Sequence, residues 1–119
     1  MARTALTVSQ VVRGGLADPA AATGQADGHK FLNNRRVFLE FNNAHASARV
    51  VTIQTGVTIG GFAVADESVT VPGSASRFKA GPFESAYFSR PSGVADAGYV
   101  YIDYPAGNET DLTVRAFSA

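Results

Sequence analysis

The stretch from Val37 to Ile53, which reads VFLEFNNAHASARVVTI, decides the fold of this chain. It contains two short runs of β-branched and aromatic residues, 37–41 and 49–53, on either side of a polar, small-residue linker. Runs of this kind, bounded by Asn, Gly, Ser or Pro, are typical of antiparallel strands and their turns. The stretch therefore predicts two paired strands, and it contains no recognisable catalytic chemistry.

Similar runs lie on both sides of this stretch. We expect further strands at about 29–32, 68–71, 77–79, 99–104 and 112–117. No long segment has the 3.6-residue periodicity of an amphipathic helix. About six to eight short strands with this spacing are typical of a sandwich or barrel. The sequence therefore predicts an all-β protein, a single antiparallel β-sandwich or jelly-roll-like domain over residues 27–119.

Alternation along these strands predicts the core, because successive side chains of a strand point to opposite faces. Odd positions from Val37 to Phe41 should face inward, which leaves Phe38 on the outer face. The segment Phe62-Ala63-Val64 is interpreted as a small apolar plug. The residues that we expect to be largely buried are Leu39, Phe41, Val51, Ile53, Val69, Val71, Val100, Ile102, Leu112 and Val114.

Residues 1–26 differ in composition and are predicted to form an N-terminal arm. Gly14-Gly15 and Thr23-Gly24 interrupt them, and the firm strand pattern begins only after Gly28. The apolar residues of this segment are enough to bind a neighbouring subunit but too few to fold alone. These residues are Leu6, Val8, Val11 and Val12. A first strand packed in the chain's own sandwich is the alternative.

Within this segment, the run Asp18-Pro19-Ala20-Ala21-Ala22 has two interpretations. An Asp at the N-cap, a Pro at the first helical position and a series of alanines favour one or two helical turns. A helix this short needs packing to persist, so a loop that contains alanines is the other interpretation.

Composition limits the partners of the chain. Its 119 residues fit one domain, and 45% hydrophobic with 17% charged residues is typical of a globular protein. A formal net charge of +0 provides no basic excess, so we expect no direct contact with nucleic acid. No apolar run approaches the roughly 20 residues of a membrane helix, and we expect no membrane partner. The N-terminus also lacks the apolar region of a signal peptide.

The candidate metal-binding and catalytic residues do not form a known motif. The histidines His29 and His45 lack the spacing of metal ligands, and we interpret both as structural or exposed. Asp27, Asp66 and Glu67 would be the accompanying carboxylates. Asp66-Glu67 and Asp103 are also candidates for acid–base chemistry, although carboxylates on turns are usually just solvated. We therefore expect no enzyme activity, no cofactor and no metal.

Aromatic residues are a stronger indication of function. The chain has 8 Phe and 4 Tyr, more than the centre of so small a core accommodates. Aromatic residues are favoured at the centres of protein interfaces. We therefore expect Phe38, Tyr87 and Phe88 to bury against another subunit.

An ordered pattern extends over about residues 28–117. It comprises GHKFLNN at 28–34, VFLEFNN at 37–43, VVTIQT at 50–55, GFAVAD at 61–66, VTVP at 69–72 and GPF at 81–83. This pattern resembles a group of small tailed-bacteriophage structural proteins encoded near the major capsid gene, which look like head decoration or cement proteins. The present chain has Asn33-Asn34-Arg35-Arg36 where that group usually has an Asn-Asp-Gly turn.

The resemblance implies a virion protein that binds the outside of a phage head and stabilises capsomer junctions. The implied partners are the major capsid protein and copies of the chain itself, as a homo-oligomer such as a trimer. The implied location is the capsid surface, after synthesis in the bacterial host cytoplasm. A head–tail connector or tail protein is the alternative. A second alternative is a carbohydrate-binding module with Tyr99, Tyr101 and Tyr104 as a sugar platform.

Overall fold

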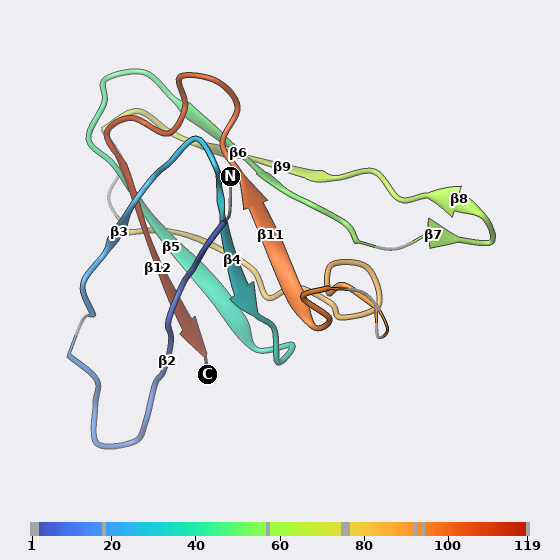
Figure 1. The fold of residues 1–119 in the computed structure, drawn as a ribbon. Helices are drawn as coiled ribbons and strands as arrows, with labels where there is room; N and C mark the ends of the chain where they lie inside the picture. The colour runs from blue at the N-terminus through green and yellow to red at the C-terminus, as the bar shows by residue number, and fades with distance from the viewer. Residues whose placement is uncertain are drawn as a thin grey trace.

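Two five-stranded sheets and a short separate hairpin form the protein in a computed structural model (Figure 1). The structure describes residues 3–17, 19–56, 58–74, 77–91, 93 and 95–118. The first sheet contains, in spatial order, β1 (Thr4–Ala5), β4 (His29–Leu32), β11 (Tyr99–Asp103), β6 (Arg49–Ile53) and β9 (Glu67–Val71). The second contains β10 (Phe78–Ala80), β5 (Val37–Asn43), β12 (Leu112–Ser118) and β2 (Val8–Gln10), with β3 (Ala22–Thr23) also paired to β12. The hairpin consists of β7 (Thr58–Ile59) and β8 (Phe62–Ala63).

The prediction of an all-β protein is confirmed over the described residues, which contain no helix. Accordingly, no helix in this part of the chain is long and apolar enough to span a membrane. The sheets are mixed, so the expectation of a purely antiparallel arrangement is wrong. The pairs β1–β4 and β2–β12 are parallel. The reason is that the chain passes from β1 to β2, and so from one sheet to the other, without a hairpin that would reverse its direction.

The core is formed by the alternating positions of both sheets. All the residues expected in the core are fully or almost fully buried, except Val69, which is half-buried and packs against it. Val69 lies on β9, the edge strand of the first sheet, where a neighbouring strand covers only one side. The core also contains Phe31, Val37, Phe83, Tyr104 and Ala116.

The pairing of β5 with β12 is the longest in the structure, since both strands have 7 residues and all of them are paired. Leu39 pairs with Ala116 toward the core, and Phe38 pairs with Phe117 on the opposite face. The rings of Phe38 and Phe117 stack with their centroids 5.5 Å apart. Phe38 thus lies on the outer face, as its position in the alternation predicts.

The N-terminal segment lies along the edges of both sheets. Leu6 and Val8 are partly buried and pack against the core. Pro19–Ala21 have no regular structure and Ala22 begins β3, so the helical interpretation is wrong for these residues; Asp18 lies outside the described ones. The reason is that the backbone of β3 pairs with β12 and is thus extended. Whether residues 1–26 also contact a neighbouring subunit stays a prediction.

Two asparagines form the turn before β5. The Asn33 and Asn34 side-chain oxygens accept hydrogen bonds from the backbone N–H groups of Arg35 (3.0 Å) and Arg36 (2.9 Å). Arg35 has a φ of 69°, in the left-handed region. An Asn side chain that accepts a hydrogen bond from the backbone N–H two residues on forms an Asx turn.

Ile53 provides a test of this core. Its side chain is 0% exposed on β6, which has a paired strand on each side. We expect Ile53→Ala to lower the free energy of unfolding by about 2–5 kcal/mol, because it leaves a cavity. Ser68→Ala, at an exposed position on the neighbouring β9, is the control. Denaturant titration gives both values, and equal stability of the two variants would contradict the assignment of this face to the core.

Candidate interaction surface

The β7–β8 hairpin projects away from both sheets (Figure 1). Gly60 and Gly61, with φ angles of 60° and 83°, form its two-residue turn. Both angles are positive, as a tight hairpin turn requires and as glycine adopts without strain. Phe62 follows this turn and is 78% exposed. The expectation that Phe62 belongs to an apolar plug is therefore wrong, because β8 pairs with β7 alone and its side chains are not directed toward the core.

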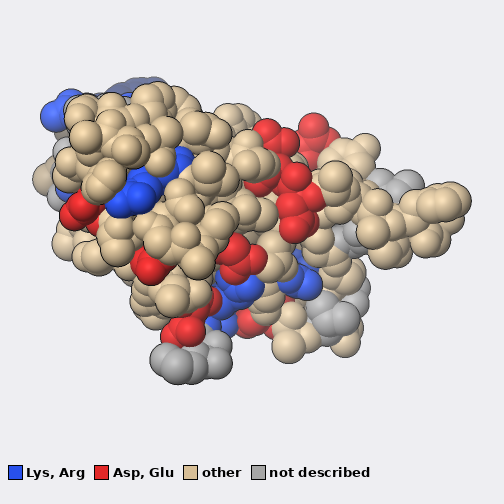
Figure 2. Space-filling model, turned by 90° about the horizontal axis from the view of Figure 1, so that it is seen from above, with Lys and Arg blue, Asp and Glu red and all other residues tan. Residues whose placement is uncertain are grey.

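The hairpin is uncharged, and its foot is acidic. No charged residue occurs from Gln54 to Ala65, whereas Asp66 and Glu67 follow directly. Figure 2 shows acidic side chains beside the foot of the projection and none on it. The Thr55 backbone N–H donates to the Asp66 carboxylate at 2.9 Å, and the Thr55 hydroxyl donates to the carbonyl of Val64 at 2.5 Å. These bonds hold the two stems of the hairpin together where they leave the first sheet.

A second apolar surface lies on the outer face of the second sheet. Val11 and Leu16, which are 47% and 41% exposed, lie on a loop after β2. With Phe38 and Phe117 they line an apolar hollow of about 190 Å³, here called the Phe38 hollow. Glu40 and Lys79 complete its lining.

The charged residues of the Phe38 hollow are paired. The Glu40 carboxylate lies 3.4 Å from the Lys79 ammonium and 3.5 Å from the Arg115 guanidinium. Glu40 is largely covered, whereas half of the Lys79 side chain is exposed. The hollow therefore has an apolar floor, and the exposed charged group in its lining is the Lys79 ammonium.

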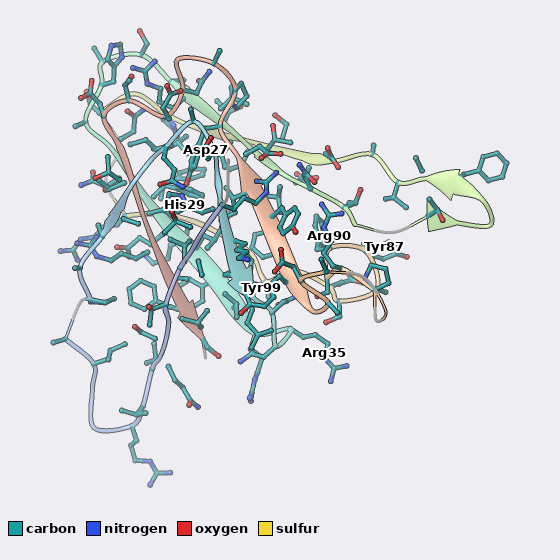
Figure 3. All side chains as sticks on the ribbon, viewed as in Figure 1. Asp27, His29, Arg35, Tyr87, Arg90 and Tyr99 are labelled. Carbon is teal, nitrogen blue, oxygen red and sulfur yellow. The ribbon has the colours of Figure 1, made fainter. Side chains whose placement is uncertain are left out.

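The remaining exposed apolar residues lie elsewhere. Leu32 ends β4 and is 55% exposed, and Tyr87 lies on the loop beside β11 (Figure 3). Phe88 is partly buried, with its ring centroid 5.4 Å from that of Phe83 in the core. Of the residues expected at an interface, Val11, Val12 and Tyr87 are exposed. The others, Leu6, Val8, Phe38 and Phe88, are half-buried in their own fold.

The tyrosines of the suggested sugar platform do not lie together. Tyr104 is buried between the sheets, contrary to the expectation that it shares a face with Tyr99 and Tyr101. The Arg3 and Arg90 guanidinium carbons lie 4.3 and 4.0 Å from the Tyr101 ring centroid. Tyr101 thus makes two cation–π contacts within the fold, and a sugar that stacked on this ring would compete with them.

Hydrogen bonds complete this polar cluster. The Lys30 ammonium donates to the Asp96 carboxylate at 2.9 Å, and the Tyr101 hydroxyl donates to it at 2.5 Å. The hydrogen bonds from Lys30 and then Tyr101 lower the pKa of Asp96. The same bond to Asp96 raises the pKa of Lys30. Asp103 accepts from Arg3 and Gln54, and Gln54 accepts from Arg90 at 2.6 Å. The polar groups are thus used within the fold, where they fasten the N-terminus and the loop before β11.

Each of the two histidines makes a hydrogen bond within its own part of the fold. His29 is buried, and its Nδ1 lies 2.8 Å from the Tyr104 hydroxyl. His45 is partly exposed, and its Nδ1 accepts a hydrogen bond from the Ser47 backbone N–H at 3.0 Å. Among the described residues, no three His, Cys, Asp or Glu side chains are grouped as metal ligands. The structural interpretation of both histidines follows from these contacts.

Burial has a consequence for the protonation of His29. It lowers the pKa of His29 from the ordinary 6.5 and raises the pKa of Tyr104 well above its ordinary value. Both groups are therefore neutral in the folded protein at neutral pH, and they share a hydrogen bond inside the core.

Among the described residues, the indications of function come from exposed apolar side chains. Comparison with protein-family models, curated proteins and solved structures finds no match to this chain. Phe62, Leu16 and Leu32 are the exposed apolar residues that sequence reasoning missed. The Gly60-Gly61 pair before Phe62 is the signal that could have located the hairpin tip, because such a pair favours a two-residue turn.

The buried His29 makes stability depend on pH. Below pH 6.5 the unfolded chain binds a proton at His29 that the folded chain excludes. The contribution of neutral His29 to the free energy of unfolding is therefore fully present above pH 6.5. It decreases as the pH falls toward the lower pKa of the folded state. We expect the free energy of unfolding to drop between pH 6.5 and about 5, above the range in which carboxylates titrate.

Substitution assigns this pH dependence to one residue. His29→Gln, which retains a polar side chain opposite Tyr104, should flatten the profile in this range, and His45→Gln should not. Urea titrations at each pH measure the effect. An unchanged slope in His29→Gln would show that another group is responsible.

Proposed function

We propose that this protein is a virion structural protein, a decoration or cement protein that binds the outside of a phage head and stabilises capsomer junctions. One observation supports this function best: exposed apolar side chains lie at separate places on a small body with no evident catalytic group among the described residues. These side chains are Val11, Val12, Leu16, Leu32, Phe62 and Tyr87. The phage head is proposed as the binding partner because the ordered pattern of residues 28–117 resembles phage decoration proteins.

A protein that stabilises capsomer junctions needs several contact sites at separate places on its surface. The Phe62 hairpin, the loop of Val11 and Leu16, and the end of β4 that carries Leu32 are different segments of one chain. The described chain extends over 40 × 38 × 23 Å, so these sites can reach different neighbours. Apolar residues at interface centres supply affinity without any chemistry. The proposed partners are the major capsid protein and further copies of the chain, on the capsid surface, after synthesis in the host cytoplasm.

We further propose that the two sheets are the layers of a β-sandwich and that residues 1–26 act as an arm. The first proposal is supported by the single core to which both sheets contribute. The second is supported by the short edge strands β1 and β2 and by the exposed loop of residues 11–17 between them and β3. Edge strands can pair with a neighbouring chain as readily as with their own.

The alternative functions differ in what supports them. A head–tail connector or tail protein would use the same apolar surfaces and differ in copy number. A carbohydrate-binding module is less favoured, because Arg3 and Arg90 already contact the Tyr101 ring and Tyr104 is buried.

A protein inventory of purified virions tests the proposed function. Mass spectrometry should detect the chain at hundreds of copies per particle, since a decoration protein occupies repeated positions on the head. Six or twelve copies would instead assign it to a connector. Absence from particles whose major capsid protein is detected would overturn the virion function altogether.

Deletion of residues 2–24 tests the arm. If the segment is an arm, the truncated protein stays folded and monomeric but no longer binds heads that lack the protein. Circular dichroism and co-sedimentation with such heads measure the two properties. Unfolding of the truncated chain would place the segment in the core and remove this part of the proposal. Thr70→Ser in the full chain, at an exposed position of β9 outside this segment, is the control for a surface change.

A further inference from the structure

We propose that the β7–β8 hairpin of one copy inserts Phe62 into the Phe38 hollow of a second copy, so that neighbouring copies are linked tip to hollow. This inference rests on the proposed function, because it identifies the partner of one apolar site as another copy of the chain. It assigns the Phe62 site to contacts between copies, which are distinct from contacts with the capsid.

The chemistry of the tip defines its partner. A single exposed apolar residue is common on protein surfaces and needs no explanation. Phe62 differs because it lies after a glycine turn, at 78% exposure, on a hairpin that pairs with neither sheet. The hairpin thus presents an aromatic side chain without contributing to the core. Its partner must offer an apolar recess without unpaired charge.

The Phe38 hollow meets these requirements. Its floor is the stacked pair Phe38 and Phe117, and Val11 and Leu16 form an apolar wall. Aromatic rings pack favourably against one another in edge-to-face or offset geometry, which allows a third ring to join this pair. The Glu40 carboxylate at the edge is already paired with Lys79 and Arg115, so it does not oppose an apolar guest.

Charge around the two sites is complementary. Asp66 and Glu67 are exposed at the foot of the hairpin. Lys79 is exposed at the rim of the hollow, exposed Arg77 lies two residues before it in the chain, and exposed Arg13 lies on the loop that forms the wall. Opposite charges that surround an apolar contact favour one orientation of the partners and disfavour like sites meeting. Two tips, each with acidic residues at its foot, would repel each other.

The positions of the two sites determine the kind of assembly. In Figure 1 the hairpin extends from one side of the molecule, whereas the loop after β2 lies on the opposite side. A hairpin that points away from its own hollow cannot fill it. Contacts between two different surfaces of identical chains are heterologous, and they produce a ring or a chain of subunits. A network of this kind would cross the boundaries between capsid subunits.

Cross-linking on the full-length protein tests the contact, because the chain contains no cysteine. Ala63→Cys places a thiol beside Phe62 and keeps the ring, and Val12→Cys places one on the loop of Val11. The control thiol is Leu32→Cys, which is also exposed but lies on β4. The single-cysteine proteins are mixed in pairs, on undecorated heads and in solution, and treated with a short bifunctional maleimide.

We expect the Ala63→Cys and Val12→Cys proteins to form heterodimers at least about tenfold faster than the Ala63→Cys and Leu32→Cys proteins, because a specific contact raises the effective concentration of the thiols. Adding Phe62→Ser to the Ala63→Cys protein should reduce the rate to that of the control pair. Equal rates for the two pairs, or faster linkage of Ala63→Cys to itself, would overturn the contact. Binding of the cysteine variants to heads is measured in parallel: retained binding with equal rates refutes only the contact, whereas loss of binding by the unmodified protein refutes the proposed function.

Discussion

The pairing of β5 with β12 is the interaction on which the rest of the structure depends. All 7 residues of each strand take part in it, from Leu112 opposite Asn43 to Ser118 opposite Val37. This register directs Leu39, Phe41 and Val114 into the core and sets Phe38 against Phe117 on the other face. A shift by one residue would exchange the two faces, so the core and the outer aromatic pair are determined together. The same β12 also holds β2 and β3, which attaches the N-terminal segment to the last strand of the chain.

The polar cluster on the first sheet shows why this face is not the candidate site. Arg3 and Arg90 contact the same tyrosine ring, and Asp96 and Asp103 accept hydrogen bonds from side chains of other elements. A ligand that bound here would have to replace these contacts, which are charge-assisted and thus stronger than neutral hydrogen bonds. The cluster instead joins β1, β4, β11 and the loop before β11. Binding surface must be sought where side chains have no such partners.

The projecting hairpin stands in contrast to this cluster. Its strands have 2 residues each and pair only with one another, so no third strand supports them. Isolated two-stranded hairpins are marginally stable in water. An exposed phenylalanine on such an element is therefore better explained by a contact with a partner than by folding. The Phe38 hollow has the opposite character, since its floor belongs to the longest strand pair of the protein. An exposed aromatic side chain and an apolar recess of this kind are suited to one another.

The sequence by itself determined the all-β class, the longer strands and most of their inward faces, because alternation with a period of two residues is a local property of a strand. It placed Leu39, Ile53 and Leu112 in the core for this reason, and every one of them is fully buried. Only the tertiary structure decided which strands are neighbours, because pairing joins residues far apart in the chain. The parallel edges β1 and β2, the half-buried Val69 and the burial of Tyr104 against His29 all depend on such neighbours. The exposure of Phe62 also depends on the tertiary structure, because its apolar side chain is equally suited to a core or to an interface. In the described structure no strand covers β8, and this assigns Phe62 to the surface.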